Sequence, residues 1–164
     1  MDNGIIKAAF NVLQDDLWDK VTAFLIHSNC RVALEDIRPY SLRLTPQVLD
    51  TTRFVGEASH RLRMVCGKKF SLITRSEVKK WVFDSFPGVC IPRIEHKMKK
   101  KGRVNKDGTS RKPSFNYVDD QIVKVAMREM YALSRKKKGE LAPLGVEDHA
   151  FQALALASFV NSFN

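Results

Sequence analysis

The sequence lacks the paired cysteines on which disulfide frameworks and structural zinc sites depend. Its three cysteines, Cys30, Cys66 and Cys90, are widely and irregularly spaced, and no CxxC or CxxxC pair occurs. An odd number of cysteines at such spacing is typical of a protein from a reducing compartment. We therefore expect no disulfide framework, no zinc finger and no bound metal.

Long apolar stretches and common catalytic motifs are also missing. No run approaches the ~20 apolar residues that cross a bilayer, and residues 1–25 lack a charged start followed by a continuous apolar segment. We therefore expect an intracellular protein that is neither secreted nor bound to a membrane. GxxxxGK[ST], GxSxG and GxGxxG patterns are absent, which favours a protein with no cofactor and no enzymatic activity.

Two histidine–cysteine pairs are the remaining candidates for metal or thiol chemistry. His27 and Cys30 are three residues apart and share one face if the segment is helical, whereas His60 and Cys66 are six apart and do not. No second close pair completes a four-ligand set. We therefore expect neither pair to hold a metal ion.

Positive charge is what the chain has in excess, and it is unevenly distributed. The formal charge is +10, with an isoelectric point of about 9.7. Residues 1–50 carry a net charge of −2, residues 51–140 carry +14 and residues 141–164 carry −2. A basic middle between acidic ends indicates one functional face rather than general solubilisation.

The segment from Pro92 to Pro113 holds the densest positive charge, with nine Lys or Arg against only Glu95 and Asp107. Such a block repels itself unless something negative lies against it, and phosphate is the commonest such partner. The predicted nucleic-acid contacts are Arg93, His96, Lys97, Lys99, Lys100, Lys101, Arg103, Lys106, Arg111 and Lys112. Alternatives are a solvated loop or a nuclear-import signal at Lys97–Arg103, which would place the protein in the nucleus without excluding nucleic-acid binding.

The hydrophobic pattern predicts a mainly α-helical, compact domain. Hydrophobic residues make up 44% of the chain and recur mostly at three- and four-residue steps, as they do in amphipathic helices. We expect five or six helices, the first over residues 3–26, and a further short helical segment at 31–38. Residues 1–140 would form the basic nucleic-acid-binding domain.

Capping residues mark the start of one long helix. Thr45 is a good N-cap, Pro46 suits the first helical position, and Gly67 is a plausible stop. The sequence therefore predicts a helix from Thr45 to about Cys66. Its expected buried stripe is Val48, Val55, Ala58, Leu62 and Val65.

Two further helices are expected after the basic segment. Asn116, with Asp119 and Asp120 in the first turn, predicts a helix that runs to about Lys138. Helix capping explains the two aspartates better than divalent-ion binding, since no companion carboxylates accompany them. Residues 141–164 then form an apolar C-terminal helix, which either packs on the core or joins copies of the chain into a homo-oligomer.

The order of elements over residues 74–118 resembles a winged helix-turn-helix in shape. A helix is expected at 74–86, with a Thr74–Glu77 capping box at its start. A turn at 87–91 and a helix at 92–101 follow it. A possible β-hairpin at 103–118 comes next, with short strands at 103–104 and 115–118. On this hypothesis Arg93, His96, Lys97 and Lys100 face DNA, while Lys106, Arg111 and Lys112 lie on the wing. The alternative is an ordinary helical hairpin with a basic loop.

Aromatic residues lie beside this charge. Phe115 and Tyr117 follow Arg111 and Lys112 closely, and exposed rings there would stack on unpaired bases. A strand anchoring itself to the core is the more common explanation of such a pair.

We therefore expect a non-catalytic nucleic-acid-binding protein, with DNA or RNA as its partner. The favoured version is a DNA-binding regulatory protein, and the alternatives are a packaging or nucleocapsid-type protein that coats nucleic acid without reading bases and an adaptor for an acidic protein. Other basic residues would extend the binding face, namely Arg61, Arg63, Lys68, Lys69 and Arg135–Lys138.

Overall fold

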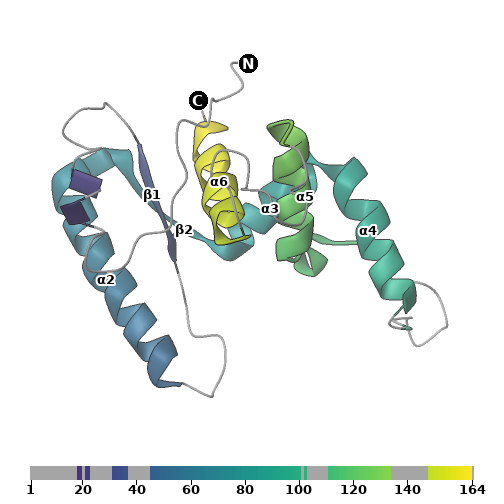
Figure 1. Ribbon diagram of the computed structural model, residues 1–164, viewed down its shortest axis with the longest axis horizontal. Coiled ribbons are helices and arrows are strands. Elements are labelled where there is room, and N and C mark those ends of the chain that lie inside the picture. Colours follow the sequence, from purple (N-terminus) through teal and green to yellow (C-terminus); the bar gives the residue numbers. More distant parts are fainter. Residues whose placement is uncertain are drawn as a thin grey trace, which may run out of the picture. The chain divides into compact units, whose positions relative to one another are not determined.

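The computed structural model describes residues 18–19, 21–22, 31–36, 45–100, 102, 111–133 and 148–163. These residues form five α-helices and a two-stranded sheet (Figure 1), which confirms the mainly α-helical class. By its internal contacts the chain divides into two units. We call Phe10–Arg75 with Val160–Asn164 the sheet unit, and Ser76–Phe159 with Met1–Ala9 the helical unit. Residues 18–19 and 21–22 are helical, and the rest of the helix expected at 3–26 lies outside the described residues.

A parallel strand pair forms the sheet unit together with one long helix. Strand β1 (Val32–Asp36) pairs with β2 (Phe70–Thr74) from Val32 opposite Phe70 to Asp36 opposite Thr74. Parallel neighbours require a crossover connection, and α2 (Pro46–Cys66) supplies it beside both strands (Figure 1). The helix expected at 31–38 is therefore wrong. Its residues include helix formers, but pairing with a strand more than thirty residues away outweighs that local preference.

Helix α2 begins and ends where its capping residues predict. The hydroxyl oxygen of Thr45 accepts a hydrogen bond from the Val48 amide at 3.3 Å, and Pro46 is the first helical residue. Gly67 ends the helix at a φ of +53°, which an L side chain rarely adopts. Val55, Ala58 and Leu62 are buried as expected. Val48 is only half-buried and Val65 is 71% exposed, so the predicted stripe is wrong at both ends of the helix.

Helices α3 (Arg75–Ser85) and α4 (Pro87–Lys100) are separated by Phe86 alone. The expected helix at 74–86 is confirmed to within one residue, but the turn expected at 87–91 is wrong. The amides of Val89 and Cys90 both donate to the Phe86 carbonyl at 3.0 Å, so α4 is already hydrogen-bonded there. Proline lacks an amide hydrogen and is favoured at the first helical position, which is why Pro87 starts a helix instead of ending one.

The described part of the expected wing is not a strand. Residues Phe115–Tyr117 form a short 3-10 helix, η2, in which the amides of Tyr117 and Val118 donate to the carbonyls of Ser114 and Phe115. These local bonds use the backbone groups that a hairpin partner would need. The strand expected at 115–118 is therefore wrong, and the other strand, at 103–104, lies outside the described residues.

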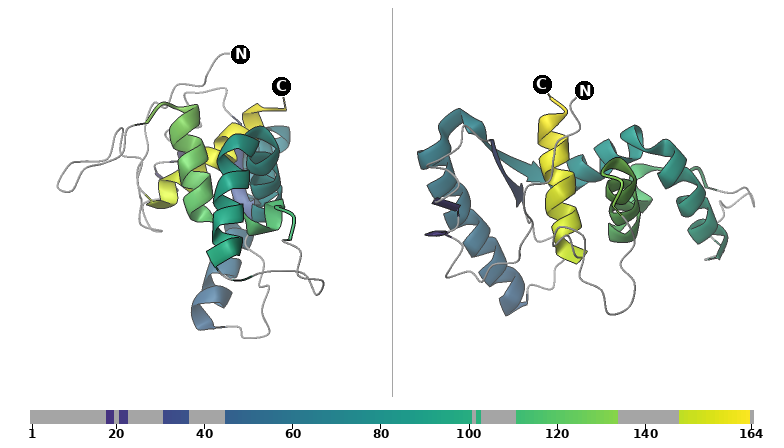
Figure 2. Two further views of the ribbon diagram at one scale, coloured as in Figure 1. Left: turned by 90° about the vertical axis from the view of Figure 1, so that its right-hand side faces the viewer. Right: turned by 45° about the horizontal axis from the view of Figure 1, so that its top comes forward.

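Helix α5 (Asp120–Met130) begins later and ends earlier than expected. Asp119, not Asn116, is its N-cap, and a carboxylate oxygen of Asp119 accepts from the Ile122 amide at 3.1 Å. The helix ends before Lys138 because Ala132 turns to a positive φ of 51°. Figures 1 and 2 place α5 beside α4, with which it makes direct contacts.

The C-terminal helix α6 (Asp148–Asn161) packs against the helical unit's core. Phe159 contacts the ring of Trp81 edge-on at 6.2 Å between centroids, and the Tyr131 and Ser158 hydroxyls are 2.8 Å apart. The helical unit's buried side chains include Val82, Ile94, Val118, Ile122, Met127 and Phe151. These contacts place α6 against the buried side chains of the helical unit, and association of copies through α6 stays a prediction.

Candidate nucleic-acid interface

The predicted contact residues that the structure describes lie on α4 and just before η2. Helix α4 carries Arg93, His96, Lys97, Lys99 and Lys100, with Glu95 as its single acidic residue. Arg111 and Lys112 follow in irregular backbone. The other predicted contacts, Lys101, Arg103 and Lys106, lie outside the described residues.

Two of the α4 cations are held by other groups of the protein. The Arg93 guanidinium donates to the Val89 carbonyl one turn earlier, at 3.1 Å. The Lys97 ammonium donates to the Asp119 carboxylate. Both side chains are half-buried, so two of the four residues expected to face DNA are drawn toward α4 and the start of α5.

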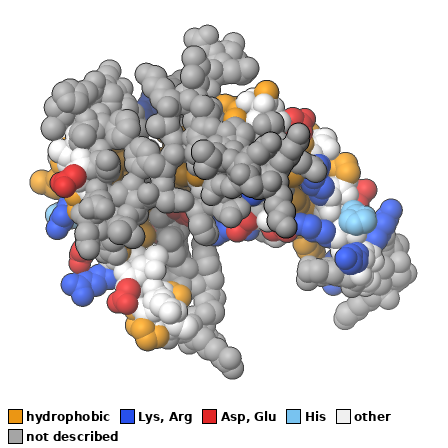
Figure 3. Space-filling view, viewed as in Figure 1, with side chains coloured by type: hydrophobic (Ala, Val, Ile, Leu, Met, Phe, Trp, Pro, Cys, Tyr) orange, Lys and Arg blue, Asp and Glu red, His pale blue; other side chains and the backbone are white. Residues whose placement is uncertain are grey.

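Five other basic side chains are exposed, and we refer to them as the basic surface: His96, Lys99, Lys100, Arg111 and Lys112. Within the described ranges, no ion pair or hydrogen bond engages any of them. Lys and Arg side chains gather with a His over α4 in the space-filling view (Figure 3). Because the charges of the four Lys and Arg side chains are not neutralised by described carboxylates, this surface attracts anions.

Asp119 links the basic helix to α5. Partial burial acts to raise the pKa of its carboxyl group, but hydrogen bonds from Lys97 and from the Ile122 and Gln121 amides, together with the Lys97 charge, outweigh burial and lower the pKa. The carboxylate therefore stays ionised at neutral pH, and the capping role expected for it is confirmed.

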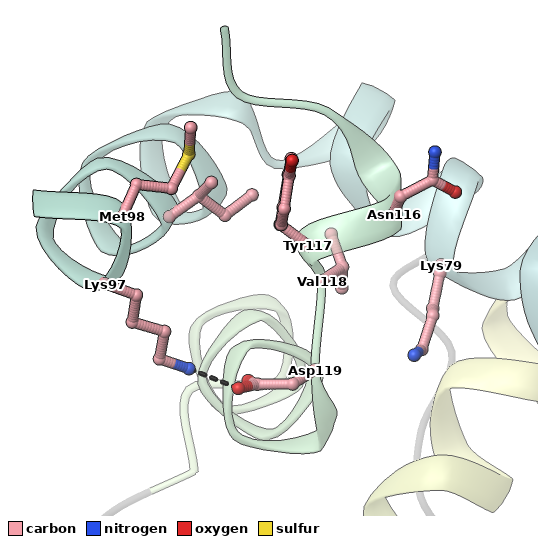
Figure 4. Close-up of a pocket in the computed structure, with 8 residues that line it drawn as sticks. Lys79, Lys97, Met98, Asn116, Tyr117, Val118 and Asp119 are labelled. Carbon is pink, nitrogen blue, oxygen red and sulfur yellow. Dashed lines mark hydrogen bonds and ion pairs between the residues drawn. The ribbon is translucent and has the colours of Figure 1, made fainter. Parts of the chain in front are cut away.

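A hollow of about 230 Å³ opens between α3, α4 and the segment that contains η2 (Figure 4). Ile94, Met98 and Val118 form its apolar part, and the Tyr117 ring lines it. Its polar groups are Lys79, Asn116 and the Lys97–Asp119 ion pair. The hollow thus combines a flat aromatic surface with hydrogen-bonding groups of both kinds.

Sequence reasoning missed this hollow as a site. The sequence predicts an aromatic ring at Tyr117 and a helix cap at Asp119, but nothing near Lys79 connects it with Asn116. Three segments build the hollow, and only their packing brings these side chains together. The single useful signal was the aromatic residue that follows a basic run.

The other basic residues expected to extend the face belong to the sheet unit or lie outside the described residues. Arg61 lies over the Trp18 ring at 5.1 Å, which is a favourable cation–π distance. Arg63, Lys68 and Lys69 are exposed at the end of α2 and in the 3-10 turn that follows, η1 (Gly67–Lys69). Residues 135–138 are not described.

The candidates for metal and thiol chemistry are only partly described. His27 and Cys30 lie outside the described residues, whereas His60 is exposed and Cys66 half-buried. In the part of the chain that the structure places, no three His, Cys, Asp or Glu side chains gather closely enough to hold a metal ion. Burial raises the pKa of the Cys90 thiol to about 11 against the opposing charge of Arg93, which disfavours the reactive thiolate.

Comparisons with protein-family models, curated proteins and solved structures find no match to this chain. Across the placed residues, none of the helices has both the length and the apolar character that crossing a bilayer requires.

Proposed function

We propose that this protein is a non-catalytic nucleic-acid-binding protein that contacts the phosphate backbone through the basic surface. The observation that carries the proposal is the exposure of Lys99, Lys100, Arg111 and Lys112 without described acidic partners. Each phosphate that such a cation neutralises releases condensed counterions, which drives binding. Helix α4 is anchored by buried Ile94 and Met98, so the lysines in its last turn are presented from a packed element.

Within this class, backbone contact without base readout by α4 is the version that the contacts favour. A recognition helix reads bases through side chains that reach into the major groove. Arg93 instead bonds to its own helix and Lys97 to Asp119. The expected strand at 115–118 is also replaced by η2. A packaging or coating role therefore fits better than a winged helix-turn-helix regulator.

A binding titration at several salt concentrations tests the proposal. The full chain is mixed with labelled single-stranded DNA, double-stranded DNA and single-stranded RNA, and with an acidic protein as the alternative partner. We expect log affinity for nucleic acid to fall linearly with log salt, with a slope of roughly −0.7 to −0.9 per phosphate contacted.

The same titration separates the alternatives. A slope near zero for every nucleic acid, together with tight binding of the acidic protein, would replace nucleic-acid binding by an adaptor role. A large preference for one duplex sequence over random duplex of equal length would restore the regulatory version.

A further inference from the structure

The hollow beside the basic surface has the size and lining of a site for one flat ring. Sites for drug-sized ligands typically enclose about 300–1,000 Å³, and this hollow encloses about 230 Å³. Ile94, Met98 and Val118 supply apolar contacts, and Tyr117 supplies an aromatic ring (Figure 4). A nucleobase is a flat ring of this kind, and every base has a π-face that stacks on an aromatic side chain.

The polar groups of the hollow suit the edge of a base better than a phosphate. Asn116 offers both a donor and an acceptor, and Lys79 lies across the hollow from Lys97 as a further donor (Figure 4). The ionised Asp119 carboxylate also lines the hollow and already holds the Lys97 ammonium. The charges of Lys97 and Asp119 offset each other, so Lys79 is the lining charge that remains unbalanced. A phosphate would lose its hydration against Ile94, Met98 and Val118, whereas a neutral heterocycle buries its faces on the same side chains.

The hollow adjoins the basic surface through α4 and through the segment before η2. Lys97 lines the hollow, and Lys100 lies three residues further on the same face of the helix. Asn116 is four residues beyond Lys112, a span of at most about 14 Å of extended chain. A strand whose phosphates contact Lys100 and Lys112 would therefore pass close to the hollow.

We propose that the hollow receives one unpaired base of a single-stranded nucleic acid, stacked on Tyr117 and hydrogen-bonded by Asn116, while the adjoining phosphates lie on the basic surface. This inference rests on the proposed function and specifies it, because a base in a duplex is stacked and paired and does not enter the hollow. The expected ligand is therefore single-stranded DNA or RNA.

Binding of matched oligonucleotides to the full chain tests this site. The probes are a single strand of ~10 nucleotides with mixed bases, the same backbone with abasic residues throughout, and the mixed strand paired with its complement. All keep the phosphates, and only the first offers unpaired bases. We expect the mixed strand to bind about tenfold more tightly than the abasic one, as stacking of one base predicts.

Variants of the hollow complete the test. Tyr117→Ala and Asn116→Ala should each remove most of the tenfold difference while leaving abasic binding unchanged, and Tyr117→Phe should retain it. Lys80→Ala on α3 and Gln121→Ala on α5 are controls, because both residues are exposed and neither lines the hollow. Circular dichroism checks that each variant folds. If Tyr117→Ala unfolds, Asn116→Ala still tests the site, because Asn116 is exposed.

The outcomes distinguish this site from the proposed function. Equal binding of the mixed and abasic strands by the wild-type protein would overturn the base site and leave backbone binding intact. Loss of both strands to the same extent in Asn116→Ala would do the same. Absence of salt-dependent binding to all three probes would overturn the proposed function, and the base site with it.

Discussion

Helices α2 and α4 each have a pair of lysines at or just beyond their C-terminal end, and the two helices pack differently around those pairs. Lys68 and Lys69 follow α2, whose last turn exposes Met64 and Val65. Lys99 and Lys100 end α4 itself, which buries one side from Val89 to Met98. The two lysine pairs therefore carry equal charge in different surroundings. The setting of α4, with a packed core behind it and a lined hollow beside it, is what favours a binding site.

The difference in packing between the two helices is expected to give the largest effect on stability. Ile94 is fully buried in α4, so Ile94→Ala should lower the free energy of unfolding by about 2–5 kcal/mol. Val65→Ala in α2 should change it by less than ~0.5 kcal/mol, because Val65 is exposed. Chemical denaturation of both variants measures the contrast. Equal losses would show that α4 is no better anchored than the end of α2.

The second-largest expected effect is a difference in nucleic-acid affinity between variants of the two lysine pairs. Replacing Lys99, Lys100 and Arg111 together by Ala should weaken nucleic-acid binding by roughly 10- to 100-fold at about 0.1 M salt and make the salt slope shallower by about two to three. The matched control replaces Lys68, Lys69 and Arg63 by Ala, since it removes the same charge from the end of α2. Fluorescence anisotropy compares the two variants. The same loss in both would mean that net charge, not the basic surface, sets the affinity.

Asp119 connects α4 to α5, and its removal is expected to have a smaller effect. Asp119→Ala should cost about 1–2 kcal/mol of stability because the cap of α5 and the Lys97 ion pair are both lost. Asp119→Asn keeps a good cap and loses only the partly exposed ion pair, so it should cost under ~1 kcal/mol. Thermal unfolding compares the two variants. Equal losses of stability would mean that the charge of Asp119, and not its capping of α5, accounts for its contribution.

The contribution of the Asp119 carboxylate to stability should depend on pH in a definite direction. The pKa of Asp119 is lowered in the folded protein, so its contribution is present above the ordinary aspartate pKa of about 4 and is lost as pH falls through the lowered value. The stability difference between wild type and Asp119→Asn should therefore shrink in acid. A difference that grows as the pH falls would contradict the lowered pKa.

The smallest effect is a difference in thiol reactivity between the two helices. Cys90 in α4 is fully buried, with its thiol 3.6 Å from the Val82 carbonyl and its pKa raised to about 11, mainly by burial. Cys66, at the end of α2, is half-buried. Iodoacetamide at about pH 8 should modify Cys66 well before Cys90, as followed by mass spectrometry of tryptic peptides. Faster modification of Cys90 would mean that the α4 core opens readily.

Local signals in the sequence predict the elements that depend on local bonds. Thr45 and Gly67 mark both ends of α2, and the apolar run after Asp148 marks α6. Strand β1 escapes prediction because its partner β2 is distant in the sequence. The charge of α4 can be predicted from the sequence because its residues lie close together in the chain. The hollow cannot, because α3, α4 and η2 form it together.

Protection of individual lysines from acetylation tests the central claim most directly. The full chain is treated with a limiting acetylating reagent, with and without single-stranded nucleic acid, and each lysine is quantified by mass spectrometry. Bound nucleic acid should protect Lys99, Lys100 and Lys112 and leave Lys68 and Lys69 as reactive as before. Protection of the α2 pair instead, or of no lysine under conditions where binding is measured, would contradict a binding site on α4.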